Sequence, residues 1–431
     1  MRPHTVYRDG FYRDASWDFA VRCLLGRASR GGSEPGEVLA TVARVEEGDH
    51  SGWFSAWSDL GNHLAAVGDA ATARGHRPGA ARAFLRSANY LATALESVDH
   101  LPDTDALLPT FRRHRLVWEA FVATGRWSVD EVEIPYEGTP MPGWHFHPED
   151  SRPPAPTLVV VNGSDGTLSG LWCEIADAAL ERGYGVLLFD GPGQQSMLFE
   201  HGIPFRPDWE AVLTPVMEHL LARDDVDPER IALYGISQGG YWATRALAFE
   251  HHFAAAVLDG GVVDVAASWR KEIPAPLLRL YDRGEHAKFE RAMELGMRTP
   301  RGRRTRAVWD FRTRPYGTSG FAETLDAVSR YQVRDVAGRV STPVLIADPD
   351  REQFFPGQSE ELSGMVEGST FVPFTEAEGA SFHCQPLARE LTAQRTLDWL
   401  DERLSPRRAP ARPPAGAPGQ PPPAPPPRSG R

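Results

Sequence analysis

The stretch DPERIALYGISQGG, residues 227–240, decides the fold of this protein. Its segment RIALY, residues 230–234, is a short apolar run typical of a buried strand, and a helical pattern of alanine and leucine follows it. Between the two lies GISQG, residues 235–239. A turn this tight from strand to helix strains its central residue, and flanking glycines remove side chains that would clash. The sequence therefore predicts that the Ser237 hydroxyl is exposed at the carboxyl end of a strand.

Further apolar runs place this turn in a mostly parallel sheet. Runs rich in β-branched residues that alternate with helical patterns predict parallel strands with helices on both faces. Residues 132–136 and 144–146 instead alternate apolar and polar residues around a Gly/Pro turn, which predicts an antiparallel hairpin before them. The fold class is therefore α/β, with a last helix over 387–404. The other predicted strands are 157–161, 185–189, 254–258, 343–347 and 370–374.

The chain divides into three regions. Residues 1–125 show helical periodicity and predict a helical N-terminal domain. Residues 126–404 carry the predicted sheet, with an Arg- and aromatic-rich helical insertion at about 266–339 that we interpret as a cap over the site. Residues 405–431 contain 11 prolines and five arginines, without any acid or large apolar residue, and predict a disordered tail.

Composition excludes several classes of function. A net charge of −12 argues against nucleic acid or an anionic membrane as the main partner. No run of about 18 apolar residues and no apolar segment behind the first residues are present, so we expect neither a membrane span nor a secretory signal. Three cysteines far apart in the chain support neither a disulfide framework nor a thiolate metal site. A cytoplasmic protein with a small-molecule substrate fits these features.

A serine hydroxyl is a weak nucleophile at neutral pH, so Ser237 requires a base, and that base requires an acid to orient it. His383 is the candidate base. It lies in EGASFHC, residues 378–384, a polar loop after the last predicted strand, and it follows the nucleophile in the chain order Ser, acid, His.

The acid is expected in DPDREQFFP, residues 348–356, after the strand 343–347. Glu352 is favoured, because it stands four residues before a proline, as in the pattern DxxVP. Asp350 is the alternate acid. Asp348 fits a turn cap better, and Asp259, after the strand 254–258, is a more distant alternative.

Main-chain amides supply the predicted oxyanion hole. The N–H of Gln238 is one donor, because it directly follows the nucleophile. The N–H of Ser164, in the loop NGSDG at residues 162–166, is the second. The loop DGPGQ, residues 190–194, is predicted to be structural. No metal or cofactor is expected, because HExxH and a GxGxxG after a strand are both missing.

Together these motifs resemble those of the α/β-hydrolase superfamily. The hairpin with PGWHFHP, the loops NGSDG and DGPGQ, the DPERIALYGISQGG turn and EGASFHC occur in the expected order between about residues 127 and 404. The helical N-terminal region, and a histidine followed by cysteine in the last loop, are similar to the group that contains 2,6-dihydroxypseudooxynicotine hydrolase and the fermentation-respiration switch protein. The resemblance implies an eight-stranded sheet, a triad of Ser237, an acid and His383, and a helical region that helps to form the pocket.

The expected function is that of a serine hydrolase acting through an acyl-enzyme. Its substrate is a small or medium-sized carbonyl compound, either an ester or a β-dicarbonyl compound cleaved at a carbon–carbon bond, in secondary metabolism or catabolism. One alternative is an acyltransferase or cyclase that uses the same three residues. A more distant one is a hydrolase-like binding protein without turnover. Apolar residues of the helical region could mediate a homodimer.

Overall fold

The computed structural model describes residues 5–101, 104–149 and 153–405. The predicted disordered tail, except its first residue, lies outside the described residues.

One mixed sheet of eight strands organises the chain, in the spatial order β1-β2-β4-β3-β5-β6-β7-β8. The hairpin β1–β2 is antiparallel and β2 pairs antiparallel with β4, whereas all the remaining pairs are parallel. The mostly parallel eight-stranded sheet predicted from the sequence is therefore confirmed. The strands are β1 (Ser128–Ile134), β2 (Met141–His147), β3 (Ala155–Val161), β4 (Gly185–Phe189), β5 (Val226–Ile236), β6 (Ala255–Asp259), β7 (Val344–Pro349) and β8 (Thr370–Phe374).

Strand β5 is longer than the sequence pattern indicates. The apolar run begins at Arg230, but the strand already begins at Val226, which pairs with Ala155 across an irregularity in the β3–β5 register. The polar residues in between interrupt the apolar pattern without interrupting the strand. Periodicity reports burial, and this end of the strand lies largely at the surface.

The N-terminal region is helical. Its longest helices are α4 and α5, which pack along one another and bury an aromatic cluster around Trp53 and Trp57. Asp14 caps α2 by accepting hydrogen bonds from the amides of Ser16 and Trp17. The elements are α1 (Val6–Asp9), α2 (Ala15–Arg27), η1 (Ala28–Arg30), α3 (Pro35–Val42), α4 (His50–Ala73), α5 (Arg77–Leu95), η2 (Val98–His100), η3 (Thr104–Ala106) and α6 (Leu107–Thr124).

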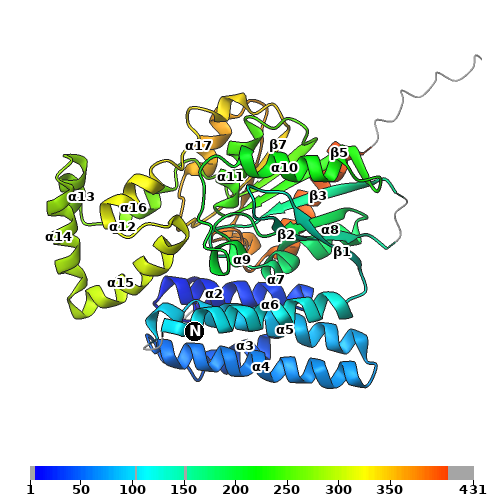
Figure 1. Cartoon of the computed structure of the whole chain (residues 1–431), viewed down its shortest axis with the longest axis horizontal. Helices are drawn as coiled ribbons and strands as arrows, with labels where there is room; N and C mark the ends of the chain where they lie inside the picture. The colour runs from blue at the N-terminus through cyan, green and yellow to red at the C-terminus, as the bar shows by residue number, and fades with distance from the viewer. Residues whose placement is uncertain (1–4, 102–103, 150–152, 406–431) are drawn as a thin grey trace, which may run out of the picture.

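This helical region shares a hydrophobic core with one face of the sheet. Phe84 of α5 and Trp118 of α6 belong to the same buried cluster as Leu158 and Val160 of β3. In Figure 1 the blue and cyan helices lie along one side of the sheet, below it in the view. The same face is covered by α7 (Leu168–Leu171), the π-helical turn η4 (Trp172–Ala176), α8 (Asp177–Glu181) and α18 (Arg389–Leu404).

The opposite face of the sheet packs against other helices and the cap. Helices α10 and α11 bury Trp209 and Trp242, whose rings stack with their centroids 4.7 Å apart. In Figure 1 helices α13 to α15 project to the left of the sheet. The remaining helical elements of the described chain are α9 (Gln195–Phe199), α10 (Glu210–Leu221), α11 (Gly239–Leu247), α12 (Ala266–Glu272), α13 (Ala275–Asp282), α14 (His286–Met297), α15 (Pro300–Thr313), η5 (Arg314–Tyr316), α16 (Phe321–Val328), η6 (Ala337–Arg339), α17 (Gln358–Met365) and η7 (Glu376–Glu378).

The cap region contacts the helical region directly. Helix α15 lies against η2, and Arg314 of η5 forms an ion pair with Asp99 of η2. Two regions that are distant in sequence therefore meet. Within the described ranges, no helix has the combination of length and apolar character that crossing a membrane requires.

Candidate active site

Ser237 lies at the turn between β5 and α11. Its backbone is in the left-handed region, with φ of 57°, which a residue with a side chain rarely adopts. Its amide donates a hydrogen bond to the carbonyl oxygen of Asp259, at the end of the neighbouring strand β6, at 2.9 Å. The strained turn is thereby held by the sheet, and the side chain is left partly exposed.

Two flanking glycines make this turn sterically possible. A Cβ on Gly235 would lie 2.5 Å from the carbonyl oxygen of Gly239, and one on Gly239 would lie 2.7 Å from the carbonyl oxygen of Val161. Both contacts are with backbone atoms, which cannot move aside without displacing the strands. The GxSxG spacing is therefore a packing requirement in this chain.

His383 faces Ser237. Its Nε2 lies 2.7 Å from the Ser237 Oγ, within hydrogen-bond distance. The ring is buried, and the residues on either side of it, Phe382 and Cys384, both have positive φ, at 74° and 54°. The amide of His383 also donates to Oε1 of Gln353 at 3.0 Å. The loop thus holds the imidazole in one position, with Nε2 directed at the hydroxyl.

Glu352 occupies the other side of the imidazole. Its Oε2 lies 2.8 Å from His383 Nδ1, while Oε1 accepts hydrogen bonds from the amides of Phe354 and Phe355 at 2.8 and 3.1 Å. Burial alone would raise the pKa of this carboxyl group, but the charge of His383 and these hydrogen bonds hold the pKa below its usual value. Glu352 is therefore ionised at neutral pH and orients the ring.

The other candidate acids do not contact His383. Asp350 is exposed, and its carboxylate accepts from the amide of Glu376 at 2.8 Å. The Asp259 side chain points away into a buried cluster, where it accepts from the Tyr234 hydroxyl at 2.6 Å. Asp348 is partly buried, and burial raises the pKa of its carboxyl group. Of the four acids considered from sequence, the structure brings only Glu352 to the imidazole.

Aromatic side chains surround the imidazole. The rings of Phe354, Phe355 and Phe19 lie with their centroids 5.0, 5.7 and 6.0 Å from that of His383. Phe19 belongs to α2 of the helical region, and Tyr316 reaches the Gln238 side chain from the cap at 3.4 Å. Phe19 and Tyr316 could not be predicted from the sequence, because nothing local distinguishes them from other core aromatics.

The predicted oxyanion loop passes beside the nucleophile. A Cβ on Gly163 would lie 2.8 Å from the Ser237 Cβ and 3.2 Å from its Oγ, so the backbone approaches the serine hydroxyl closely. Within the described part of the chain, the amides of Ser164 and Gln238 donate to no protein acceptor. Two free N–H groups next to an exposed serine are the donors that an oxyanion requires.

The loop predicted to be structural holds the oxyanion loop in place. Gln194 Nε2 donates to the carbonyl oxygens of Asn162 and Gly163 at 3.0 and 3.4 Å, and Gln195 Nε2 donates to that of Gly166 at 3.1 Å. Both glutamines are buried. They bind the carbonyl side of the loop and leave the neighbouring Ser164 amide unpaired.

A further acid, Glu96, is influenced by the charge of Asp165, which belongs to the predicted oxyanion loop. Burial and, to a smaller extent, the charge of Asp165 together raise the pKa of Glu96, just after α5, to about 8, whereas Arg27 opposes the shift.

Replacing Glu96 by glutamine should stabilise the protein at alkaline pH only. Because its pKa is raised on folding, the folded state holds this proton more tightly than the unfolded state, and stability falls between about pH 4.5 and 8. We expect E96Q to match the wild type at pH 4.5 and to exceed it by about 1 to 3 kcal/mol at pH 9, in urea unfolding. The exposed Glu229→Gln should show no such difference. Equal stability of E96Q and wild type at both pH values would contradict the assignment.

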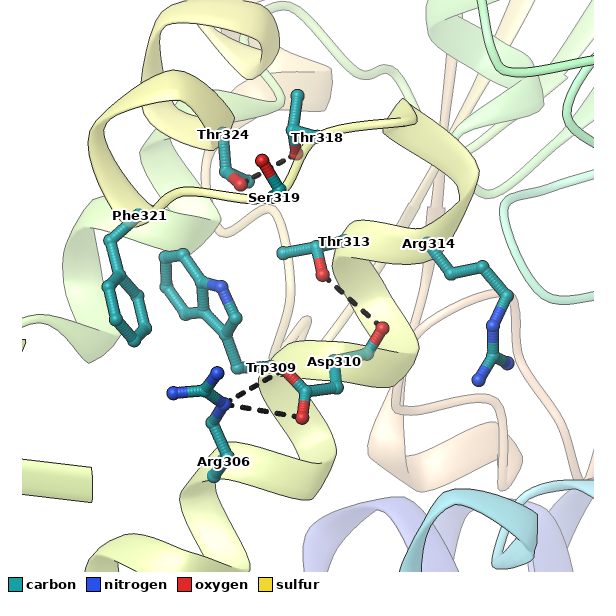
Figure 2. Close-up of a pocket in the computed structure, with 9 residues that line it drawn as sticks. All are labelled: Arg306, Trp309, Asp310, Thr313, Arg314, Thr318, Ser319, Phe321 and Thr324. Carbon is teal, nitrogen blue, oxygen red and sulfur yellow. Dashed lines mark hydrogen bonds and ion pairs between the residues drawn. The ribbon is translucent and has the colours of Figure 1, made fainter. Parts of the chain in front are cut away.

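The cap contains a separate cavity of about 250 Å³. Figure 2 shows its lining, in which Arg306 pairs with Asp310 and the hydroxyls of Thr318 and Thr324 bond to each other. Asp310 also accepts from Thr313 through its carbonyl oxygen. The polar groups are thus largely satisfied by one another, and the lining includes none of the three residues at the nucleophile. We assign no ligand to this cavity.

One group of described side chains approaches the composition of a metal site. His145, His147 and Asp225 bring ligand atoms within 4.8 Å of one another. However, Arg223 already binds Asp225 and Asp130, and each of these aspartates also contacts a nitrogen of His147, at 3.3 and 3.1 Å. The Arg223 guanidinium already supplies the positive charge that a metal ion would bring to these carboxylates. We therefore interpret the group as an ion-paired cluster.

The chain is similar in sequence to a known family and to several characterised proteins. The model of the prolyl oligopeptidase family matches residues 179–293, which include Ser237. The Aspergillus fumigatus protein "Alpha/beta hydrolase psoB" is 28% identical over 428 residues, covering 93% of this chain and 94% of that protein. The Gibberella moniliformis protein "20-hydroxy-prefusarin hydrolase FUS2" is 31% identical over 280 residues, covering 63% of this chain and 65% of that protein.

Among solved structures, the 2,6-dihydroxy-pseudo-oxynicotine hydrolase superposes with a TM-score of 0.69 and 20% identity. The match covers 88% of this chain and 95% of that one, so the helical region is included as well as the sheet. The similarity shows a shared fold and confirms the fold expected from the sequence motifs.

Proposed function

We infer that this chain, which belongs to the α/β-hydrolase superfamily and is an enzyme of that type, is a serine hydrolase that forms an acyl-enzyme on Ser237. One observation carries the proposal: Ser237 Oγ lies 2.7 Å from His383 Nε2, and Glu352 lies 2.8 Å from the opposite nitrogen. This chain of hydrogen bonds lets a neutral hydroxyl lose its proton as it attacks a carbonyl carbon.

In the proposed reaction, His383 Nε2 takes the Ser237 proton while Oγ forms a bond to the carbonyl carbon. The carbonyl electron pair moves to oxygen, which the amides of Ser164 and Gln238 stabilise. When the carbonyl reforms, the leaving group departs with the bonding pair and takes the proton from His383. Water then repeats the sequence, with His383 as base, and releases a carboxylic acid and the free serine.

The proposed substrate is a small or medium-sized carbonyl compound. An ester would lose an alcohol, whereas a β-dicarbonyl compound would lose an enolate-stabilised carbanion that His383 protonates. One relative is named a hydrolase of 20-hydroxy-prefusarin, which supports a role in the conversion of a secondary metabolite.

A second candidate is transfer of the acyl group to an alcohol or amine, including an intramolecular one. The aromatic surroundings of His383, which leave its side chain 3% exposed, support this alternative because they limit access of water to the acyl-enzyme.

A fluorophosphonate probe and a substrate screen test the proposal. We expect the probe to label Ser237, identified by peptide mass spectrometry. The screen combines p-nitrophenyl esters of graded chain length with a β-diketone, each with and without a competing alcohol. Turnover of an ester or the diketone supports hydrolysis, and a product joined to the alcohol supports transfer. Failure of the probe to label Ser237, together with no turnover, would overturn the proposal.

A further inference from the structure

A guanidinium is buried behind the candidate active site. Arg389, the first residue of α18, is 2% exposed, and it lies between two buried carboxylates. Its Nη1 is 2.9 Å from Asp259 Oδ2, and its Nε is 2.6 Å from Glu174 Oε2. Nη2 donates to the Tyr234 hydroxyl at 3.0 Å. All these groups lie within the protein core, away from solvent.

This cluster is joined to both halves of the Ser237–His383 pair. The carbonyl oxygen of Asp259 accepts from the Ser237 amide at 2.9 Å and from the Cys384 thiol at 3.2 Å. Arg389 Nη1 also donates to the carbonyl oxygen of Cys384, the residue after His383, at 2.5 Å. One side chain thus binds the strand end that holds the nucleophile and the loop that holds the base.

The cluster also reaches the helical region. Glu174, in η4, accepts from Arg27 Nε at 3.1 Å through its second oxygen. Arg27 ends α2 and donates to Asn89 of α5 at 3.2 Å. The same helix α2 carries Phe19, whose ring contacts His383. Alternating charges therefore run without a break from α2 to the Ser237 turn.

Four charges in a buried network are costly for folding. Ion pairs that are removed from water often contribute less stability than apolar side chains of similar volume would. Arg27 and Arg389 balance Glu174 and Asp259, so the network carries no net charge. The network instead fixes the local geometry, because a planar guanidinium holds several hydrogen-bond acceptors in defined positions at once.

We propose that Arg389 is a positioning residue, which sets the distance between Ser237 and His383 and couples it to the helical region. The proposal rests on the proposed serine-hydrolase function. Arg389 touches neither residue's reacting atom. It acts through Asp259 and through the backbone of Cys384.

Arg389→Lys tests this role, because lysine keeps the positive charge but cannot bind all these acceptors in one plane. We expect kcat for the best ester to fall by about 10²-fold with KM changed less than about twofold, because a displaced base affects the chemical step. Fluorophosphonate labelling of Ser237 should slow by a similar factor. Arg395→Lys, on the same helix but paired with Glu378 at the surface, is the matched control and should leave both rates unchanged.

A loss of activity through unfolding must be distinguished from a loss through a displaced base. Active-site titration with a slowly released acyl group counts competent molecules, and circular dichroism reports the fold. A fall in kcat per titrated site supports the proposal. If Arg389→Lys keeps the wild-type kcat per titrated site but has fewer titratable sites, the role of Arg389 is purely structural, and the proposal is overturned.

A second variant serves if Arg389→Lys does not fold. Glu174→Gln keeps the shape but removes one of the two charges that hold the guanidinium. We expect a smaller fall in kcat, about tenfold, again with little change in KM. An unchanged kcat in folded Glu174→Gln would overturn the proposal. Wild-type protein whose Ser237 is not labelled would instead contradict the proposed function itself.

Discussion

Replacing Ser237 by alanine should lower kcat for ester hydrolysis by about 10⁶-fold, to the rate left by binding and the oxyanion amides alone. In the proposed mechanism the Ser237 hydroxyl forms the acyl-enzyme, and its removal leaves the imidazole without a proton to accept. The fold should persist, because the turn is held by main-chain hydrogen bonds and by glycine contacts that do not involve Oγ.

The measurement is single-turnover and steady-state hydrolysis of the best p-nitrophenyl ester, with thermal unfolding as a check on folding. Ser329→Ala is the matched control, since Ser329 lies on the surface of the cap. Retention of more than about 1% of the wild-type kcat in the Ser237 variant would mean that another nucleophile does the chemistry.

Replacing Glu352 by glutamine is expected to lower kcat by about 10³- to 10⁴-fold, the effect seen when a triad carboxylate becomes an amide. Glutamine has nearly the same shape and can still accept from the Phe354 and Phe355 amides through its oxygen. It cannot stabilise the charged imidazole that forms as Ser237 loses its proton. The rate of the chemical step should therefore fall, with little change in KM.

Asp350→Asn is the decisive comparison, because Asp350 was the alternate acid from sequence. Its carboxylate binds the Glu376 amide, so kcat should stay within about threefold of the wild type. The two variants are compared with the same ester at pH 7 to 9. A large loss of kcat in Asp350→Asn with normal activity in Glu352→Gln would contradict the arrangement seen in the structure.

The pattern of apolar runs was sufficient to predict the sheet. Strands β4 and β8 begin and end where the sequence pattern placed them, because each is a short run bounded by residues that favour turns. Strand β5 was underestimated at its polar beginning. The spatial order of the strands was not predicted, since periodicity carries no information on which strands pair.

The choice of acid was harder to predict. Three carboxylates stand within the five residues 348–352, and spacing to Pro356 was the only guide. The local turn decides which carboxylate reaches the imidazole. Arg351 takes a positive φ of 60°, and the side chain of the next residue, Glu352, turns towards His383. Such a turn cannot be read from composition.

The supporting residues could not be predicted at all. Phe19 and Arg389 are separated by 370 positions in the sequence, yet both act on the same loop. Arginine makes up nearly all of the basic residues here, so nothing marks one of them as buried. Only the tertiary contacts distinguish Arg389 from the arginines at the surface.

The core that α5 and α6 share with β3 has a consequence for synthesis of the chain. The ribosome makes these helices before the strands that cover them, so their apolar faces remain exposed to other nascent chains until β3 has left the exit tunnel. The helical region buries a cluster of its own around Trp53, but the faces of α5 and α6 that pack on the sheet are covered only after the later residues have been made.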